Sequence, residues 1–304
     1  MSRRGWVLFA AMSVIWGIPY LLIKIAVADV SPIVVVFSRS AVGALLLLPL
    51  AARPGHLRLL LREWKALLLY TVIELCIPWF TLSAAETRVS SSFAALLLAA
   101  IPLVAVAMAW TTTGRDRLDR TRVTGLLLGV TGVGSLVGFD VRAGDVWAVL
   151  AIGVTVLGYA AGPVIFSRRL ADLPGIPVVA ASLGLTAILY APFAITSMSH
   201  HWPRASATTA LITLGVVCSA LAFVTFFALI REVGPARATV ITYVNPVVAA
   251  IAGIAIRNEH LSTGMIAGFP LVLVGSYLAT RRARPARPGV SGDADALTTT
   301  ESSA

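Results

Sequence analysis

The sequence predicts an all-α membrane protein with ten transmembrane helices, arranged as two inverted five-helix repeats. Apolar residues make up 58% of the 304-residue chain and charged residues only 12%, and a soluble fold cannot cover that much apolar surface. The apolar residues form ten segments of about 20 residues, the length that a helix needs to cross a bilayer. The second half of the chain also repeats the first half in outline.

The predicted spans use nearly all of the chain up to residue 281. They lie near 6–27, 32–52, 65–84, 90–111, 122–139, 145–166, 177–197, 208–230, 236–256 and 262–280. This division gives a first repeat over 6–139 and a second repeat over 145–281, with five spans in each. No stretch remains that is long enough for a separate soluble domain.

Prolines recur at a constant spacing in the two halves. Pro19 and Pro163 are 144 residues apart, and so are Pro102 and Pro246. Each of them lies in an apolar span, where proline removes a backbone hydrogen bond that lipid cannot replace. We expect these four residues to be hinges or walls of a cavity between the repeats, although a packed kink is the alternative at any one of them. Because each repeat has an odd number of spans, the second repeat must enter the membrane in the opposite direction.

The net charge of +10 is concentrated on one side of the predicted membrane. With the N-terminus in the cytoplasm, eighteen cationic residues fall on the cytoplasmic side: Arg3, Arg4, Arg53, Arg58, Arg62, Lys65, Arg115, Arg117, Arg120, Arg122, Arg168, Arg169, Arg231, Arg237, Arg281, Arg282, Arg284 and Arg287. Only Arg88, Arg142, Arg204 and Arg257 fall on the opposite side. This bias is a positive-inside signal that places both termini in the cytoplasm. The charge therefore needs no nucleic-acid partner to explain it.

The two ends of the chain need separate interpretation. Ser2, Arg3 and Arg4 before an apolar run imitate a twin-arginine signal peptide, but that run is about 20 residues long instead of 7–15. Cleavage would also leave nine spans, so residues 6–27 are predicted to be the first helix. Residues 283–304 lack aromatic side chains and are rich in Ala, Pro, Ser, Thr and Gly, so we expect a disordered cytoplasmic tail.

Glycines mark the fifth and tenth spans. Gly125 and Gly129, and likewise Gly264 and Gly268, have the spacing of small residues that lets helices approach closely. We predict that these glycines pack against another helix. The sequence leaves open whether that helix belongs to the same chain or to a second subunit.

Three charged residues lie inside predicted spans. Glu74 is at the centre of the third span, Arg39 is close to the middle of the second, and Lys24 is near the end of the first. An acid at that depth costs roughly 3 kcal/mol or more unless it is neutral, paired or hydrated. By depth, Arg39 is the better partner for Glu74. The two residues are predicted to form either a structural charge pair or a site for substrate or protons.

Aromatic and amide side chains near the same depth form the predicted substrate site, which suits an amphipathic small molecule. With Glu74, its members are Trp16, Tyr20, Trp79, Tyr159, Phe223, Phe227, Tyr243 and Asn245. The two phenylalanines can equally face lipid or a neighbouring helix. Asn245 is the strongest candidate in its span, because an amide in hydrocarbon must find a partner.

Catalytic, metal and cofactor sites are not expected. Cys76 and Cys218 lie in spans without further ligands at metal-binding spacing, and no nucleotide-binding motif occurs. The alternatives to transport are an intramembrane enzyme and a receptor or scaffold. An enzyme would need a Ser/His or Asp/Asp set at membrane depth, whereas the four histidines, His56, His200, His201 and His260, fall in predicted loops.

A family resemblance rests on the second repeat. Residues 234–253 (GPARATVITYVNPVVAAIAG), followed by 257–261 (RNEHL) and Gly268, resemble the end of an EamA-type repeat in the drug/metabolite transporter superfamily. Trp16, Gly17 and the segment from Pro32 to Arg39 resemble the start of the first repeat.

The resemblance implies a secondary carrier in the bacterial inner membrane, with a central cavity between two five-helix bundles. Such carriers mostly export amino acids, related metabolites or amphipathic drugs, and proton coupling is one way to drive export. The chain departs from the family pattern after the fourth and ninth spans, where only the acids Asp116 and Glu259 are kept. We interpret both acids as caps that accept hydrogen bonds from free backbone N–H groups at helix starts.

Overall fold

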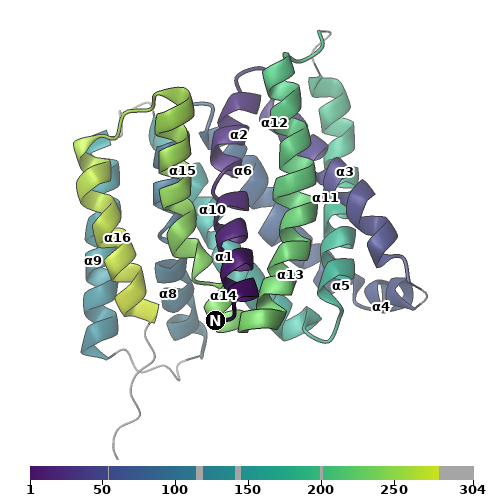
Figure 1. Ribbon diagram of the computed structural model, residues 1–304, viewed down its shortest axis with the longest axis horizontal. Helices are drawn as coiled ribbons and strands as arrows, with labels where there is room; N and C mark the ends of the chain where they lie inside the picture. The colour runs from purple at the N-terminus through teal and green to yellow at the C-terminus, as the bar shows by residue number, and fades with distance from the viewer. Residues whose placement is uncertain (54, 114–118, 141–144, 199–200, 281–304) are drawn as a thin grey trace, which may run out of the picture.

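The computed structural model describes residues 1–53, 55–113, 119–140, 145–198 and 201–280, and these ranges contain helices, turns and no strand. The helices run side by side along one axis, and the N-terminus lies at the lower end in Figure 1. The tail predicted over 283–304 and the acid Asp116 lie outside the described residues.

The first repeat contains ten helical segments in the described residues. The first nine are α1 (Arg3–Ile15), α2 (Pro19–Ala26), α3 (Pro32–Ala51), α4 (His56–Arg62), α5 (Trp64–Tyr70), the π-helix η1 (Thr71–Cys76), α6 (Ile77–Ala85), α7 (Ser91–Leu98) and α8 (Ile101–Thr113). Helix α9 (Arg120–Asp140) completes this repeat. Several of these segments follow one another within a single predicted span.

The second repeat begins at α10 (Val146–Ile165). It continues through the π-helix η3 (Phe166–Leu170), α11 (Gly175–Ser197), α12 (Ala205–Gly215), the π-helix η4 (Val216–Leu221), α13 (Ala222–Val233), α14 (Pro235–Ala238), α15 (Ile241–Arg257) and α16 (Thr263–Thr280).

Nine helical stretches in the described part of the chain are long and apolar enough to span a bilayer. The helix at the position of the predicted ninth span, Ile241–Arg257, is apolar but shorter. Large apolar side chains such as Leu45, Leu150 and Ile188 are more than half exposed, as is expected where a helix faces lipid. The predicted all-α membrane architecture is therefore confirmed.

The matched prolines have different effects in the two repeats. The first span is interrupted between Ile15 and Pro19, and the fourth between Leu98 and Ile101, next to Pro102. Pro163 and Pro246 instead lie inside the continuous helices α10 and α15. The predicted symmetry of the prolines therefore does not extend to symmetric breaks in the helices.

Two π-helices occupy equivalent positions in the repeats. Adding 145 to the bounds of η1, Thr71 and Cys76, gives the bounds of η4, Val216 and Leu221. A π-turn holds one more residue than an α-turn and often occurs at a functional site. Glu74 lies within η1, at the centre of the third span.

The glycine-rich fifth and tenth spans, α9 and α16, pack against each other at one edge of the molecule (Figure 1). A Cβ atom added at Gly125 or Gly132 would collide with the backbone of α16, and one added at Gly275 would collide with the backbone of α9. The partner predicted for these glycines is thus a helix of the same chain.

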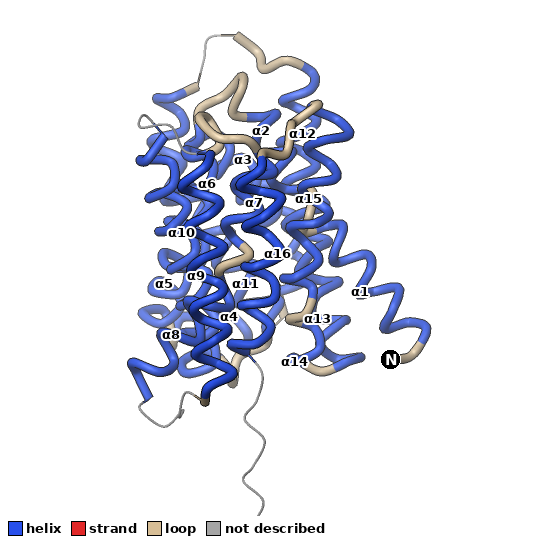
Figure 2. The backbone as a smooth tube through the Cα atoms, turned by 90° about the vertical axis from the view of Figure 1, so that its left-hand side faces the viewer, coloured by secondary structure: helices blue, strands red, loops and turns tan. Residues whose placement is uncertain are grey.

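A separate apolar cluster lies between three other helices. Met12, Leu229 and Ile241 are buried between α1, α13 and α15, and Figure 2 shows α1 beside α13 and α14 towards the lower end.

Polar contacts hold the loops at one end of the molecule, and those of Glu259 join the two repeats. Glu259, just beyond α15, accepts hydrogen bonds from the backbone N–H groups of Ser91 and Ser92 at 3.0 and 2.9 Å. Lys24 donates to the carbonyl oxygens of Glu86 and Val89 at 2.6 and 2.8 Å. Glu259 is therefore a capping acid as predicted, but it caps the distant helix α7 instead of the helix that follows it.

Candidate functional site

Both repeats contribute side chains to a polar set near the middle of the membrane. Its members are Tyr20 from α2, Arg39 from α3, Glu74 from η1, Trp79 from α6, Tyr159 from α10 and Cys218 from η4. Arg39 connects this set electrostatically, because Tyr20, Tyr159 and Cys218 all lie close enough to interact with its charge. The sequence predicted every member except Cys218 as a site residue.

The guanidinium group of Arg39 lies over the indole ring of Trp79. Its Cζ atom is 3.6 Å from the ring centroid, a cation–π arrangement that stabilises a desolvated cation. Arg39 is only 5% exposed, and its Nε has no hydrogen-bond partner. Trp79 is buried as well.

The predicted charge pair between Arg39 and Glu74 is not formed. No ion pair within 4 Å joins the two residues in the described part of the chain, and the Oε2 atom of Glu74 lacks a hydrogen-bond partner. The physical reason is that the two side chains point in different directions. Arg39 stacks on Trp79, whereas the Glu74 carboxyl group faces α10. A Cβ atom at Gly162 would overlap the Glu74 carboxyl group, so this glycine makes room for it.

Tyr159 connects the two charged residues. Its phenol lies close enough to interact with the charges of Arg39 and Glu74. Because Tyr159 belongs to the second repeat and the two charged residues to the first, a movement of one repeat relative to the other would change these interactions.

Glu86 is a buried acid that the sequence analysis missed. It is 0% exposed, and neither of its carboxyl oxygens has a hydrogen-bond partner. Burial raises the pKa of Glu86 well above its usual range, although the nearby Lys24 ammonium opposes this shift. The predicted third span ended at residue 84, which placed Glu86 in a loop, whereas α6 continues to Ala85. The one sign of a nearby acid in the sequence was Lys24, a cation inside a predicted span for which no partner had been assigned.

Trp16, Phe223 and Phe227 lie in an aromatic cluster with Phe226. Trp16 packs edge to face against Phe223, with the ring centroids 5.9 Å apart, and its ring lies 4.7 Å from that of Phe226. Phe223 also belongs to the apolar cluster that contains Trp79 and Tyr159. Phe227 packs against Gly175 at the start of α11.

Tyr243 and Asn245, two further predicted site residues, make contacts between helices. The Tyr243 hydroxyl group bonds to the Ser276 carbonyl oxygen at 3.3 Å and to Thr280 Oγ1 at 3.0 Å, which ties α15 to α16. With the amide oriented towards acceptors, Asn245 Nδ2 donates to the carbonyl oxygens of Ile241 at 3.0 Å and Ser13 at 3.2 Å. These bonds connect α15 to α16 and to α1, and none of their partners belongs to the set around Arg39.

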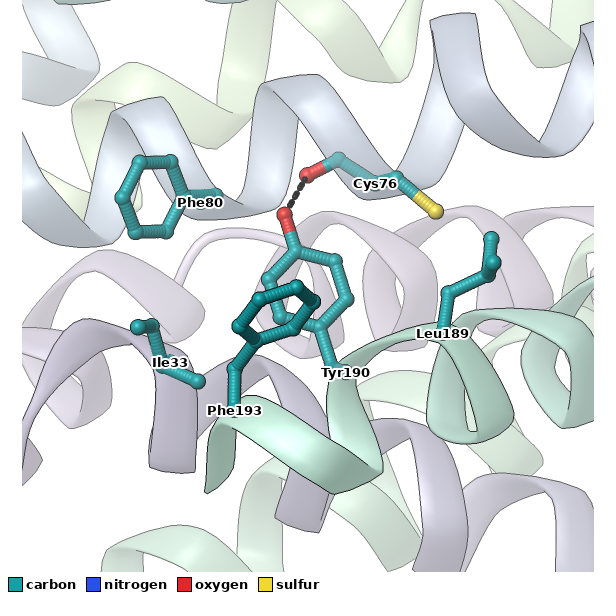
Figure 3. A pocket seen from close by; sticks show the side chains of 6 residues that line it. All are labelled: Ile33, Cys76, Phe80, Leu189, Tyr190 and Phe193. Atoms are coloured by element: carbon teal, nitrogen blue, oxygen red, sulfur yellow. Dashed lines mark hydrogen bonds between the residues drawn. The ribbon is translucent and has the colours of Figure 1, made fainter. Parts of the chain in front are cut away.

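A pocket of about 330 Å³ lies between α3, α6 and α11 (Figure 3). Its lining is Ile33, Cys76, Phe80, Leu189, Tyr190 and Phe193, and it includes no predicted site residue. The Tyr190 hydroxyl group, which is the most polar group there, donates to the Cys76 carbonyl oxygen at 2.9 Å (Figure 3). Since Leu189 and Phe193 are strongly exposed, this pocket is on the lipid-facing side and offers little polar recognition.

The next feature is the arrangement of metal-ligating and thiol side chains in the described residues. These residues contain no cluster of three or more His, Cys, Asp or Glu side chains. Cys76 and Cys218 are both free and buried, and the Cys76 thiol contacts Thr186 Oγ1 at 3.5 Å. His56 starts α4, and His260 lies in the turn before α16, so neither histidine reaches the polar set.

The comparisons with known proteins concern the fold and the family of the chain. The model of the EamA-like transporter family matches residues 3–138 and 146–281. The chain is 30% identical over 297 residues to the "Uncharacterized inner membrane transporter YedA" of Escherichia coli, with 92% of each chain covered. It is 23% identical over 295 residues to the "Uncharacterized transporter YvbV" of Bacillus subtilis, with 96% of each covered.

A solved structure described as "Crystal structure of protein" shares the fold. Its TM-score is 0.66 at 23% sequence identity, and the alignment covers 91% of this chain and 96% of the other. Two matched repeats, the membrane-spanning helices and the family relatives together show that this chain belongs to the EamA-like transporter family and is a multi-pass membrane transporter.

Proposed function

We propose that the chain is a secondary-active carrier that exports a small organic solute from the cytoplasm by alternating access, with Glu74 as its proton-exchanging group. The observation that carries this proposal is the polar set around Arg39, to which both repeats contribute at mid-membrane depth. Inverted-repeat carriers bind substrate at such a place, since rocking one repeat against the other opens it to each side in turn.

Glu74 is the proposed coupling group because of its surroundings. Its carboxyl group lies in a π-helical turn at the centre of a span, and its Oε2 has no hydrogen-bond partner. A charged carboxylate in hydrocarbon needs a partner or water. Release of a proton from Glu74 therefore requires a rearrangement of η1 or α10, and this requirement would link protonation to the change between inward and outward states.

The proposed direction and orientation rest on the charge bias and on the resemblance. Eighteen of the cationic residues fall on the side that also holds the N-terminus, which supports cytoplasmic termini. Export is the usual activity implied by the EamA resemblance, and amino acids, related metabolites and amphipathic drugs are the expected solute classes. We favour transport over catalysis in the membrane because an enzyme would need a catalytic set such as Ser/His within the spans. The histidines in the described residues lie between helices or at a helix start.

Counterflow in proteoliposomes tests the proposal. A thermal-shift screen of amino acids, nucleosides and amphipathic ions on the purified protein would first identify a ligand. A radiolabelled sample of that ligand should then accumulate transiently in liposomes preloaded with the unlabelled compound, because an alternating-access carrier exchanges one molecule for another. Passive equilibration without this overshoot would contradict a carrier, and conversion of the ligand to a product would indicate an enzyme.

A further inference from the structure

We infer that Arg39 binds an anionic group, and that the transported solute is an organic monocarboxylate with an apolar or aromatic body. The inference deepens the proposed function, since the carboxylate is taken to belong to the carried solute. It starts from a buried cation that has no anion beside it.

Arg39 lacks the counter-ion that its position requires. The guanidinium group stays charged in proteins, and a buried charge is normally paired or hydrogen-bonded. Arg39 is 95% buried, since 5% of its surface is exposed, and its Nε has no partner. The guanidinium group lies against the Trp79 ring, which partly stabilises a cation but does not neutralise it.

Neither neighbouring acid takes the counter-ion role. Glu74 forms no ion pair with Arg39 and faces Gly162 instead. Both carboxyl oxygens of Glu86 are without hydrogen-bond partners, so Glu86 does not contact the guanidinium group either. Among the cations near Glu86, Lys24 acts on it more strongly than Arg39 does.

The surroundings of Arg39 suit a carboxylate. The planar guanidinium fork matches the two oxygens of a carboxylate and can bind both at once. The phenols of Tyr20 and Tyr159 interact electrostatically with the Arg39 charge, and a phenol O–H is a hydrogen-bond donor of the kind that a carboxylate accepts. The Trp79 ring belongs to the same apolar cluster as Phe223, and Phe223 packs against Trp16. These aromatic rings offer an apolar surface for the body of the solute.

The second repeat has no charged residue at the position equivalent to Arg39. Spacings of 143 and 144 place Ser182 and Leu183 opposite it, on helix α11. Both of these residues are fully buried, and α11 packs against α3. Because the repeated scaffold forms at this position of α11 without a charge, the charge of Arg39 is not needed to build the scaffold.

Three small probes with one aromatic body test the inference. Phenylacetate, 2-phenylethanol and phenethylamine present an anion, a neutral hydroxyl group and a cation at pH 7, and binding to the full-length protein in lipid nanodiscs is measured by calorimetry. We expect phenylacetate to bind about tenfold or more tightly than the other two probes, since a desolvated charge pair exceeds 1.4 kcal/mol. Inorganic phosphate and acetate, as additional probes, should compete weakly because they lack the apolar body.

Variants separate Arg39 from general charge effects. Arg39→Gln should lower phenylacetate affinity about tenfold or more, and Arg39→Lys should retain part of it, because a point charge replaces a bidentate fork. Arg58→Gln, which removes an exposed arginine in α4, is the matched control and should bind normally. If Arg39→Gln does not fold, the comparison rests on Arg39→Lys, which should bind phenylacetate more weakly than the wild type and bind 2-phenylethanol with unchanged affinity, so that the selectivity between the two probes falls without disappearing.

The inference is overturned if 2-phenylethanol or phenethylamine binds as tightly as phenylacetate, if phenylacetate does not bind, or if the Arg39 variants leave its affinity unchanged. Inorganic phosphate binding more tightly than phenylacetate would overturn the carboxylate assignment. The proposed function can fail separately: phenylacetate binding through Arg39 without counterflow of any solute contradicts a carrier and leaves the anion site intact. Counterflow of phenethylamine without phenylacetate binding would support a carrier and contradict the anion site at Arg39.

Discussion

Glu259 in the second repeat holds Ser92 in the first through two hydrogen bonds. Its Oε2 atom accepts from the Ser92 backbone N–H at 2.9 Å and from Ser92 Oγ at 2.6 Å, while Oε1 binds the same two groups of Ser91. The carboxylate thus caps the start of α7 from 167 residues away in sequence. This contact joins the two repeats next to the connection between α15 and α16, which lies at the upper end in Figure 1.

This cap predicts a pH dependence of stability. Burial acts to raise the pKa of Glu259, but the hydrogen bonds from Ser92 and Ser91 outweigh it and hold the pKa below its ordinary value of 4.5. A lowered native pKa means that the cap stabilises the fold at neutral pH and is lost as the pH falls through the native value. Glu259→Gln should therefore cost about 1 kcal/mol at pH 7 and less at pH 3.

Thermal unfolding in detergent at pH 7, 5 and 3 measures this difference. Glu63→Gln, at a partly exposed acid before α5, is the matched control, and its midpoint should stay parallel to that of the wild type. An equal loss for Glu259→Gln at all three pH values would show that the cap does not titrate as proposed.

Gly162→Ala should impair the site around Glu74. The added methyl group would overlap the Glu74 carboxyl, so either the carboxyl or helix α10 must move, at a cost of about 1–3 kcal/mol. Gly153→Ala on the same helix is the control, because a Cβ atom there meets nothing within 4 Å. Proton-driven flux should fall in the first variant and not in the second. Equal flux in both would mean that Gly162 is not needed to position Glu74.

Tyr243→Phe and Asn245→Ala should lower stability and leave ligand affinity unchanged. Each change removes hydrogen bonds that hold α15 to α16 or to α1, with an expected cost of about 1 kcal/mol each. The sequence alone suggested the opposite outcome, a loss of affinity with folding intact. Thermal shift and calorimetry on the same samples separate the two, and a tenfold loss of affinity at normal stability would return these residues to the substrate site.

Cysteine labelling tests the orientation in the membrane. Trp202 is 95% exposed and lies in the turn between α11 and α12, which the charge bias places outside the cell. In a background without Cys76 and Cys218, which are both buried, Trp202→Cys should react with a membrane-impermeant maleimide in intact cells. A cysteine at Arg58 should react only after permeabilisation. The reverse pattern would invert the proposed topology.

The architecture was predictable because it follows from composition and spacing. Apolar spans of bilayer length and prolines repeated at one offset define the crossings and their duplication. The glycines of α9 and α16 were predicted to pack, although their partner depends on the closed tertiary fold. The π-turn at Glu74 was not predictable, because one extra residue in a turn leaves an apolar sequence unchanged.

The sequence indicated which polar and aromatic side chains lie near each other better than it indicated their contacts. Arg39 lies close to Tyr20, Trp79 and Tyr159, as their similar depth in the predicted spans suggested, and their role in binding a substrate stays a prediction. The partner of Arg39 was predicted wrongly, since depth alone says nothing about the direction of a side chain around its helix. Glu86 was missed because it follows the end of α6, where a loop residue is expected to be exposed, whereas the packing of the repeats buries it completely.

Flux driven by a pH gradient in Glu74→Gln proteoliposomes tests the central claim most directly. Glutamine keeps the shape of the side chain and fixes it in the neutral state, so a carrier that exchanges protons at Glu74 should lose pH-driven net flux while solute counterflow survives. Glu63→Gln should transport like the wild type. Unchanged pH-driven transport in Glu74→Gln would contradict the account and leave Glu74 as a buried acid without a coupling role.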